Sequence, residues 1–336
     1  MVKFLVKRLI LSIFVLFGIS ILIFCLARII PGDPARLALG ERASDEAVAE
    51  LREAMHLDAP IYEQYYYWLK DVLKGDFGLS LNTQRDVSLD VQQFLPATLE
   101  LVIVAGIISI AMAFVFGLLS SKYKDSWIDG TIRVFSYIGI SVPAFVWAIL
   151  FLLFFGYVWD ILPVFNRLSA GITEPNRITG MYILDFCLQG NLRGALDALA
   201  HVFLPALALA VGHIFQEARI LRSSLIDNME KEFISVTTGY GIPKRKIMSS
   251  YLLKPSAISV TTVAGLDFAN TLGNAFLVET IFNWPGISRY CLNAMMTKDL
   301  NAISAVVLII GIIYMIVNII VDIVIAALDP RVRLGD

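Results

Sequence analysis

Six long stretches of apolar residues, separated by polar segments, dominate the chain. They cover residues 9–27, 101–121, 134–159, 198–216, 255–278 and 300–321. A run of about 20 apolar residues is long enough for a helix to cross the hydrocarbon core of a bilayer. The first run lacks the small-residue cleavage site that ends a signal peptide, so we expect it to remain as an anchor. The pattern predicts an all-α polytopic membrane protein with six transmembrane helices.

Basic residues lie unequally on the two sides that these spans define. Lys3, Lys7 and Arg8 precede the first span, and residues 219–254, between the fourth and fifth spans, hold seven of the 27 Lys and Arg residues. Segments rich in Lys and Arg stay in the cytoplasm by the positive-inside rule. We therefore expect both the N- and C-termini and the loop 219–254 to be cytoplasmic.

The polar segments divide the chain into three parts. Residues 1–30 form the cytoplasmic N-terminus and the first transmembrane helix. Residues 31–95 hold twelve Asp or Glu against six Lys or Arg, and a segment of this length is expected to form an extracytoplasmic helical cap rather than a simple connection. Residues 96–336 form the transmembrane core, which includes the cytoplasmic loop at about 219–254.

Two predicted spans depart from a plain apolar helix. The third contains Pro143, which removes a helical hydrogen bond and is expected to kink the helix. The fifth is broken by Asp267 and carries Asn270, Thr271 and Asn274. At the spacing i, i+3, i+4 and i+7, these four polar residues fall on one face of a helix.

The polar face of the fifth span has two interpretations. A charged side chain at the bilayer centre costs at least about 2.5–3.5 kcal/mol on insertion scales, so it faces a bundle interior or water. The face is either a hydrogen-bond network between helices or a polar lining for the passage of a substrate. We favour the lining, because four polar residues share the face.

Composition and motifs exclude several classes of function. The chain is 57% hydrophobic, and its net charge of −2 gives no reason to expect nucleic-acid binding. Its three cysteines and three histidines are scattered, so we predict no disulfide framework, no metal site and no catalytic constellation. The Gly-rich phosphate-binding loop of P-loop ATPases is absent from the sequence. The chain is therefore expected to bind no cofactor and to take its energy from a partner.

Within the cytoplasmic loop, residues 232–241 have the pattern of a short helix. Glu232 and Phe233 are followed by small residues and by Gly241, which can end a helix because glycine takes positive φ. Pro243 then fits the first turn of a next helix, where its missing N–H costs nothing. The segment is either a helix on the membrane surface, offered to a cytoplasmic partner, or an ordinary solvated loop with a basic rim.

The same residues resemble the signature loop of the membrane subunits of type I ABC importers. In that family a triplet of small residues, followed by a glycine, docks in a groove of the ATPase subunit. Many importers carry an acidic residue at the start of the triplet, where Ser235 stands here, so the resemblance assigns that contact to Glu232. The coupling residues that it implies are Glu232, Phe233, Ser235, Val236, Thr237 and Gly241.

Further strings along nearly the whole chain resemble landmarks of the dipeptide/oligopeptide/nickel permease family, in the family's order. They include Pro31-Gly32-Asp33-Pro34, Gly75-Asp76-Phe77-Gly78-x-Ser80, Leu95-Pro96-Ala97-Thr98-x-Glu100, Ser141-Val142-Pro143, Leu204-Pro205-Ala206, Arg219-x-x-Arg222-Ser223-Ser224, Glu279-Thr280-Ile281-Phe282-x-Trp284-Pro285-Gly286 and Asp329-Pro330-Arg331. The resemblance implies the type I ABC importer permease fold, and it gives Glu279 a role in an external gate.

The resemblance also implies a set of partners. A second homologous permease subunit completes the pathway across the lipid bilayer, and two ABC ATPase subunits bind ATP and Mg²⁺ and power transport. An extracytoplasmic substrate-binding protein delivers the substrate. The assembly is expected in the cell membrane of a prokaryote, with this chain as a non-catalytic subunit.

The loop 160–197 bears on the substrate. Its segment 179–185 resembles the peptide branch of the family more than the nickel branch, so we expect di- and oligopeptides, whose positive amino end Asp267 would meet. Nickel or other metal chelates, glutathione and oligosaccharides are the alternatives. A channel or secondary transporter that works without ATP is a more remote alternative, because it leaves the patterned cytoplasmic loop unexplained.

Overall fold

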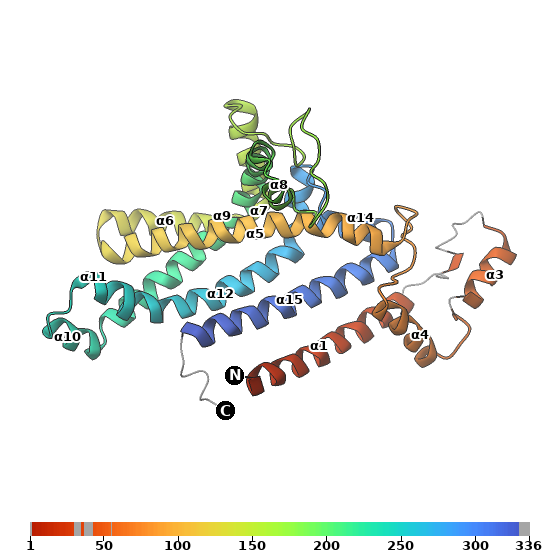
Figure 1. The fold of residues 1–336 in the computed structure, drawn as a ribbon, viewed down its shortest axis with the longest axis horizontal. Helices are drawn as coiled ribbons and strands as arrows, with labels where there is room; N and C mark the ends of the chain where they lie inside the picture. The colour runs from red at the N-terminus through yellow and green to blue at the C-terminus, as the bar shows by residue number, and fades with distance from the viewer. Residues whose placement is uncertain (1, 30–34, 37–42, 55, 329–336) are drawn as a thin grey trace.

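The computed structural model describes residues 2–29, 35–36, 43–54 and 56–328, which form a bundle of helices (Figure 1). Within these residues the only β-pairing is an isolated bridge between Leu79 and Asp86. The prediction of an all-α fold is therefore confirmed for the described part of the chain. The strings at 31–34 and 329–331 lie outside the described residues.

Four helices in the described residues are long and apolar enough to cross a membrane. They are α1 (Val2–Ile29), α5 (Val87–Lys122), α9 (Leu192–Met229) and α15 (Leu300–Leu328). A bent pair of helices over residues 127–158 would make a fifth. α12 (Leu253–Asn274) covers most of the predicted fifth span but is not among them, because its polar residues lower its hydropathy. The total of six spans stays a prediction.

Pro143 divides the predicted third span into two helices. α6 (Trp127–Ser141) ends before it, and α7 (Ala144–Phe151) follows and continues as the π-helix η1 (Leu152–Val158). The axes of the two parts differ by 104°, because proline lacks the N–H that would continue the helix and disfavours a helical conformation in the preceding residue. The sequence predicted a kink within one span, and the observed break is sharper (Figure 1).

α9 is the central helix of the bundle. It contacts α5, α6, α7 and α12, and its middle turns carry Ala206, Ala208 and Ala210, which are fully buried. Small side chains let neighbouring helices approach closely. Where α9 passes α5, a Cβ added to Gly117 would lie 2.9 Å from the side chain of Leu221. Close packing of this kind fixes α9 against α5.

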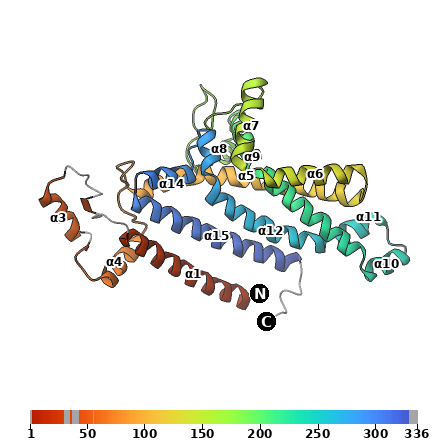
Figure 2. The same cartoon turned by 180° about the vertical axis from the view of Figure 1, so that it is seen from behind.

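The two ends of the bundle carry different elements. In Figures 1 and 2, α10 (Glu232–Gly239), α11 (Lys244–Lys246) and the turn between α5 and α6 lie toward one end, which we call the inner end. α3 (Asp45–Ala54), α4 (Ile61–Leu73) and α14 (Ile287–Met296) lie toward the other, the outer end. The topology predicted from the basic residues also separates these two groups of segments, with the inner group on the cytoplasmic side and the outer group on the opposite side.

α4 connects the outer polar segment to the first long helix. Tyr65 of α4 shares a hydrogen bond of 2.8 Å with Ser20 of α1. The ring of Tyr65 also lies edge-on against Phe24, with ring centroids 5.3 Å apart. These contacts give the predicted cap a fixed attachment to α1.

α5 crosses the predicted boundary between the cap and the core. The helix begins at Val87 and runs through Pro96 without ending. A proline inside a helix leaves the carbonyl four residues earlier, here that of Gln92, without its helical partner. The guanidinium of Arg177, from the outer loop, donates a hydrogen bond to this oxygen. The missing hydrogen bond is thereby replaced, and the cap and core share one continuous helix.

Candidate coupling helix and translocation pathway

α10 lies on the surface of the inner end, as a short helix at the position that the sequence predicts. Most of its side chains point away from the bundle, and Val236 is 55% exposed. Apolar side chains gathered on an otherwise polar surface are typical of an interaction site. The exposed residues of this segment include Glu232, Phe233, Ser235, Val236, Tyr240 and Gly241.

The opposite side of α10 packs onto the bundle. Ile234, together with Ile242 just beyond the helix, joins a hydrophobic cluster in which α9 meets the π-helix η2 (Ile247–Leu252). Thr237 is half-buried, and its carbonyl accepts a hydrogen bond of 3.3 Å from the N–H of Ile242. The buried members of the cluster are Leu221, Leu225, Ile247, Leu252 and Val260.

A chain of hydrogen bonds ties the beginning of α10 to two long helices. The Nζ of Lys231 donates to Oδ1 of Asn228 over 2.7 Å. The Nδ2 of Asn228, near the end of α9, donates to Oγ of Ser256 in α12 over 2.9 Å. Both Asn228 and Ser256 are buried, so the hydrogen bond between these two residues is protected from water. These hydrogen bonds link the residue just before α10 to α9, and α9 to α12.

Gly241 ends the segment 232–241 for a conformational reason. Its φ is +72°, a region that L side chains rarely adopt, and an added Cβ would meet nothing within 4 Å. The position therefore demands glycine for its backbone conformation and not for lack of space. Pro243 follows at the residue just before α11, close to the place that the sequence predicts.

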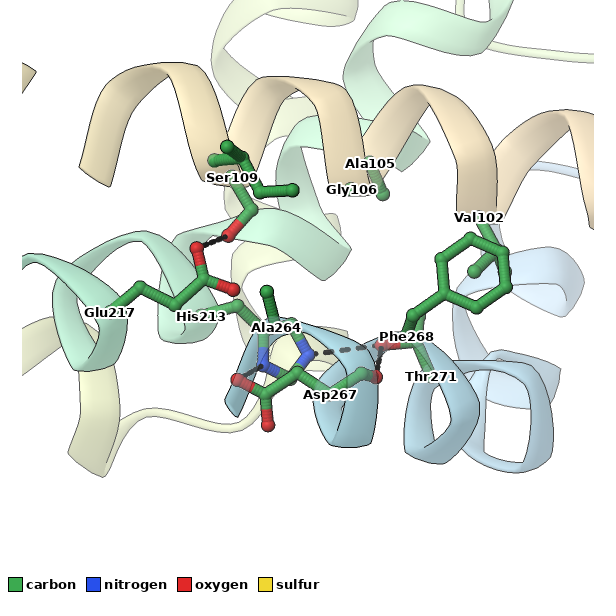
Figure 3. Close-up of a pocket in the computed structure, with 11 residues that line it drawn as sticks. Val102, Ala105, Gly106, Ser109, His213, Glu217, Ala264, Asp267, Phe268 and Thr271 are labelled. Carbon is green, nitrogen blue, oxygen red and sulfur yellow. Dashed lines mark hydrogen bonds and ion pairs between the residues drawn. The ribbon is translucent and has the colours of Figure 1, made fainter. Parts of the chain in front are cut away.

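Asp267 and Thr271 of α12 face α9 (Figure 3). Oδ2 of Asp267 lies 3.3 Å from Nδ1 of His213, and Nε2 of Gln216 lies 3.4 Å from the same oxygen. The hydroxyl of Thr271 donates to the carbonyl of Asp267 over 2.6 Å, so its oxygen accepts from Nε2 of His213 at 3.0 Å. The carboxylate is thus held by side chains of this chain.

A second carboxylate, Glu217, lies beside the first. Its side chain is only 1% exposed, and the hydroxyl of Ser109 in α5 donates to it over 2.9 Å. Glu217, Ser109, His213, Asp267 and Thr271 line a cavity of about 40 Å³ between α5, α9 and α12, which has room for a few water molecules. Sequence reasoning missed Glu217 because the predicted fourth span ended just before it, although a charge beside a span was itself a usable signal.

Asn270 and Asn274 do not join this cluster. Both are exposed, and Nδ2 of Asn274 donates to the carbonyl of Asn270 over 2.9 Å. The two asparagines lie on one edge of the predicted polar face, and Asp267 and Thr271 lie on the other edge, which α9 covers. The structure therefore divides the four predicted pathway residues into a buried pair and an exposed pair.

Glu279 lies in α13 (Phe276–Ile281) at the outer end and is fully buried. Its Oε1 accepts a hydrogen bond of 2.5 Å from Thr98, and its Oε2 accepts one of 2.7 Å from the N–H of Arg289. Nε1 of Trp284 donates to the carbonyl of Ala97 over 2.9 Å. Two of the landmark strings, 95–100 and 279–286, are thus bound to each other. Glu279 does not contact the predicted pathway residues of α12 through any of these hydrogen bonds.

A buried ion pair joins α5 to the outer loop. One NH2 group of Arg167 donates to Glu100 over 2.6 Å and to the carbonyl of Gly180 over 3.0 Å. The guanidinium also lies 3.5 Å from the ring centroid of Tyr182, in α8 (Tyr182–Leu188). The other oxygen of Glu100 accepts from the N–H of Ile183 over 2.7 Å. Glu100 belongs to a landmark string of the sequence, but no spacing rule pointed to Arg167 as its partner.

Asp185 of α8 organises the turn before this helix. Its carboxylate accepts hydrogen bonds from the N–H groups of Ile178, Thr179 and Gly180, at 3.3, 2.8 and 2.9 Å. Burial acts to raise the pKa of Asp185, but the hydrogen bonds from Thr179, Gly180 and Ile178 outweigh burial and hold the pKa below its ordinary value. The carboxylate is therefore ionised at neutral pH and fixes the turn 178–180 against α8.

Metal-binding geometry is absent from the described residues, which contain no group of three or more His, Cys, Asp or Glu side chains placed to hold a metal ion. Cys25, Cys187 and Cys291 are free thiols.

Two family models match this chain. Residues 113–334 match the family described as the binding-protein-dependent transport system inner membrane component, and residues 1–102 match the N-terminal family of the same kind of component. The chain belongs to this family of membrane components. The resemblance drawn from its landmark strings is thereby confirmed, and the permease is an integral membrane protein.

Relatives of the permease match it over nearly its whole length. The probable D,D-dipeptide transport system permease protein DdpB of Escherichia coli is 36% identical over 96% of this chain and 95% of its own. The dipeptide transport system permease protein DppB of Alkalihalophilus pseudofirmus is 34% identical over 99% of this chain and 100% of its own. The di/tripeptide transport system permease protein DppB of Pseudomonas aeruginosa is 30% identical over 99% of both chains.

Proposed function

We propose that the permease is a transmembrane subunit of an ATP-driven importer of di- and oligopeptides. It forms the translocation pathway with a second homologous permease subunit and receives its substrate from an extracytoplasmic binding protein. Two ABC ATPase subunits, which bind ATP and Mg²⁺, supply the energy at the cytoplasmic side. The permease has six transmembrane helices, and both termini and the inner end face the cytoplasm. It lies in the cell membrane of a prokaryote.

The two-sided arrangement of α10 is the observation that carries this proposal. Its exposed side, with Phe233 and Val236, is available to the ATPase subunit. Its buried side packs onto the cluster formed by α9, η2 and α12, and Lys231, just before the helix, donates a hydrogen bond to Asn228 of α9. Closure of the ATPase pair around ATP moves α10, and α9 and α12 move with it. The helices that carry His213 and Asp267 thereby change position, which opens the pathway to one side or the other.

The polar residues of α12 have different roles in the pathway. Asn270 and Asn274, exposed on this chain, face the second permease subunit and offer amide groups to the backbone of a peptide. Asp267 lies behind the two asparagines, where its negative charge attracts the amino end of the substrate. His213 holds the carboxylate of Asp267 in position. Glu279 shapes the outer gate by fixing Thr98 against Arg289. The names of the relatives favour peptides as the substrate class.

The proposal is tested by ATP hydrolysis of the reconstituted assembly in lipid, with its binding protein present. Dipeptides, longer peptides, glutathione, oligosaccharides and nickel chelates are added in turn. We expect peptides alone to stimulate hydrolysis. Stimulation by a different class would exclude peptides and leave the importer function standing. Failure of any ATPase subunit to co-purify, with no response to any ligand, would contradict the importer function itself.

A further inference from the structure

A pocket of about 210 Å³ opens between α6 and the inner half of α9. The site described above does not use it. Its polar lining comes from the end of α5, from α6 and from α9, and it includes Ser120, Arg133, Ser136, Tyr137, Arg219 and Arg222. Three arginines therefore border one small cavity.

One carboxylate, that of Asp129, lies beside two of these three arginines. Asp129 of α6 is fully buried, and Arg222 donates to both of its oxygens over 2.7 Å. Nε of Arg133 lies 3.7 Å from Oδ2 of the same carboxylate. Arg219 is exposed and, among the residues that the structure describes, makes no ion pair or side-chain hydrogen bond. The pocket thus presents an excess of positive charge, and much of it is free to bind a ligand.

The surroundings of the pocket are those of a membrane interface. Trp127, at the start of α6, is 79% exposed, and Tyr137, in the pocket wall, is 65% exposed. Tryptophan and tyrosine are enriched at the level of the lipid headgroups. Val134 and Phe135 of α6 are exposed beside them and give an apolar surface along which acyl chains can lie. A charged pocket beside an apolar helix face combines the two features that a phospholipid needs.

We propose that this pocket binds the phosphate group of an anionic phospholipid from the cytoplasmic leaflet. The inference goes beyond peptide import, and it uses the orientation proposed above, in which the inner end is cytoplasmic. The planar donor groups of Arg133 and Arg219 match the geometry of a phosphate. Basic pockets between transmembrane helices on the cytoplasmic side are suited to anionic headgroups. Arg222 has a different role, because its bond to Asp129 holds α6 against α9.

Binding of phosphatidylglycerol to the purified assembly, measured by native mass spectrometry, tests the proposal. The pocket variant carries Arg133→Gln and Arg219→Gln, both of which replace exposed side chains. The control variant carries Lys244→Gln and Arg245→Gln, two exposed basic residues of α11 at the same end of the molecule. We expect the pocket variant to lose about fivefold in affinity for each arginine removed and the control to bind as the wild type does.

Three results would overturn the proposal. The first is unchanged affinity in the pocket variant, and the second is an equal loss in the control, which would indicate diffuse attraction. The third is binding of inorganic phosphate at the pocket without any binding of the lipid, which would identify the ligand as a free anion. Peptide-stimulated ATP hydrolysis, recorded on the same wild-type preparation, separates a failure of this inference from a failure of the import function. The thermal midpoint of each variant shows whether it is folded.

Discussion

At the scale of single residues, each buried carboxylate in the part of the permease that the structure describes has a partner. Asp267 faces His213, Glu217 accepts from Ser109, and Glu279 accepts from Thr98. A buried charge without a partner is strongly unfavourable, so these pairs come together as the helices pack. The sequence indicated that Asp267 had to face a bundle interior or water. It did not show that His213 was the partner, because helix periodicity relates residues on one helix and not on two.

The pairing of Asp267 with His213 predicts non-additive effects on transport. Asp267→Asn and His213→Gln should each slow peptide uptake, because each disturbs the same contact between α9 and α12. The double variant should be no slower than the slower single variant, with a coupling free energy of about 0.5–3 kcal/mol. Initial rates of uptake by the wild type and the three variants give this coupling. If the rate reductions of the two single variants multiply in the double variant, the two residues act separately. Normal uptake by the Asp267→Asn variant would show that the charge of Asp267 has no role in the pathway.

At the scale of elements, the sequence predicted those whose signals are local. The small helix α10, its terminating Gly241 and the disruption at Pro143 were all visible as short patterns. The connection between the landmark strings 95–100 and 279–286 was not visible, because it depends on the folding of α5 beside α13. The strings were recognisable one by one, and the structure shows that they form one unit.

The close packing of Gly286 on Glu279 predicts a sharp difference between two glycine variants. A Cβ added at Gly286 would lie 2.1 Å from Oε1 of Glu279, whereas a Cβ added at Gly273 of α12 would meet nothing within 4 Å. Gly286→Ala should therefore destabilise the permease by about 1–3 kcal/mol, because overpacking displaces a buried, hydrogen-bonded carboxylate. Thermal unfolding of the purified protein measures the change. Gly273→Ala is the matched control, and equal midpoints for the two variants would contradict the account of this contact.

At the scale of the whole molecule, continuous helices connect the surface of α10 at the inner end to the bonded strings 95–100 and 279–286 at the outer end. α9 runs from the outer loop to the beginning of α10, and α12 runs from the inner end to the outer α13. The arrangement of basic residues predicted which segments gather at each end. It could not predict that residues 127–158 would bend by 104°, because the direction of the chain after Pro143 depends on packing against α9. The sequence likewise could not show that α9 covers Asp267 and Thr271 of α12 and leaves Asn270 and Asn274 exposed.

The number of peptides transported per ATP hydrolysed measures whether α10 converts ATP hydrolysis into movement of the pathway. Gly241→Val places a side chain where φ is +72°, whereas Gly239→Val adds the same side chain in α10, at a position without positive φ. A positive φ costs an L residue about 1–2 kcal/mol or more, so only the first change should displace the segment. We predict that Gly241→Val hydrolyses ATP with little transport and that Gly239→Val keeps the wild-type ratio. A wild-type ratio in Gly241→Val would contradict the account.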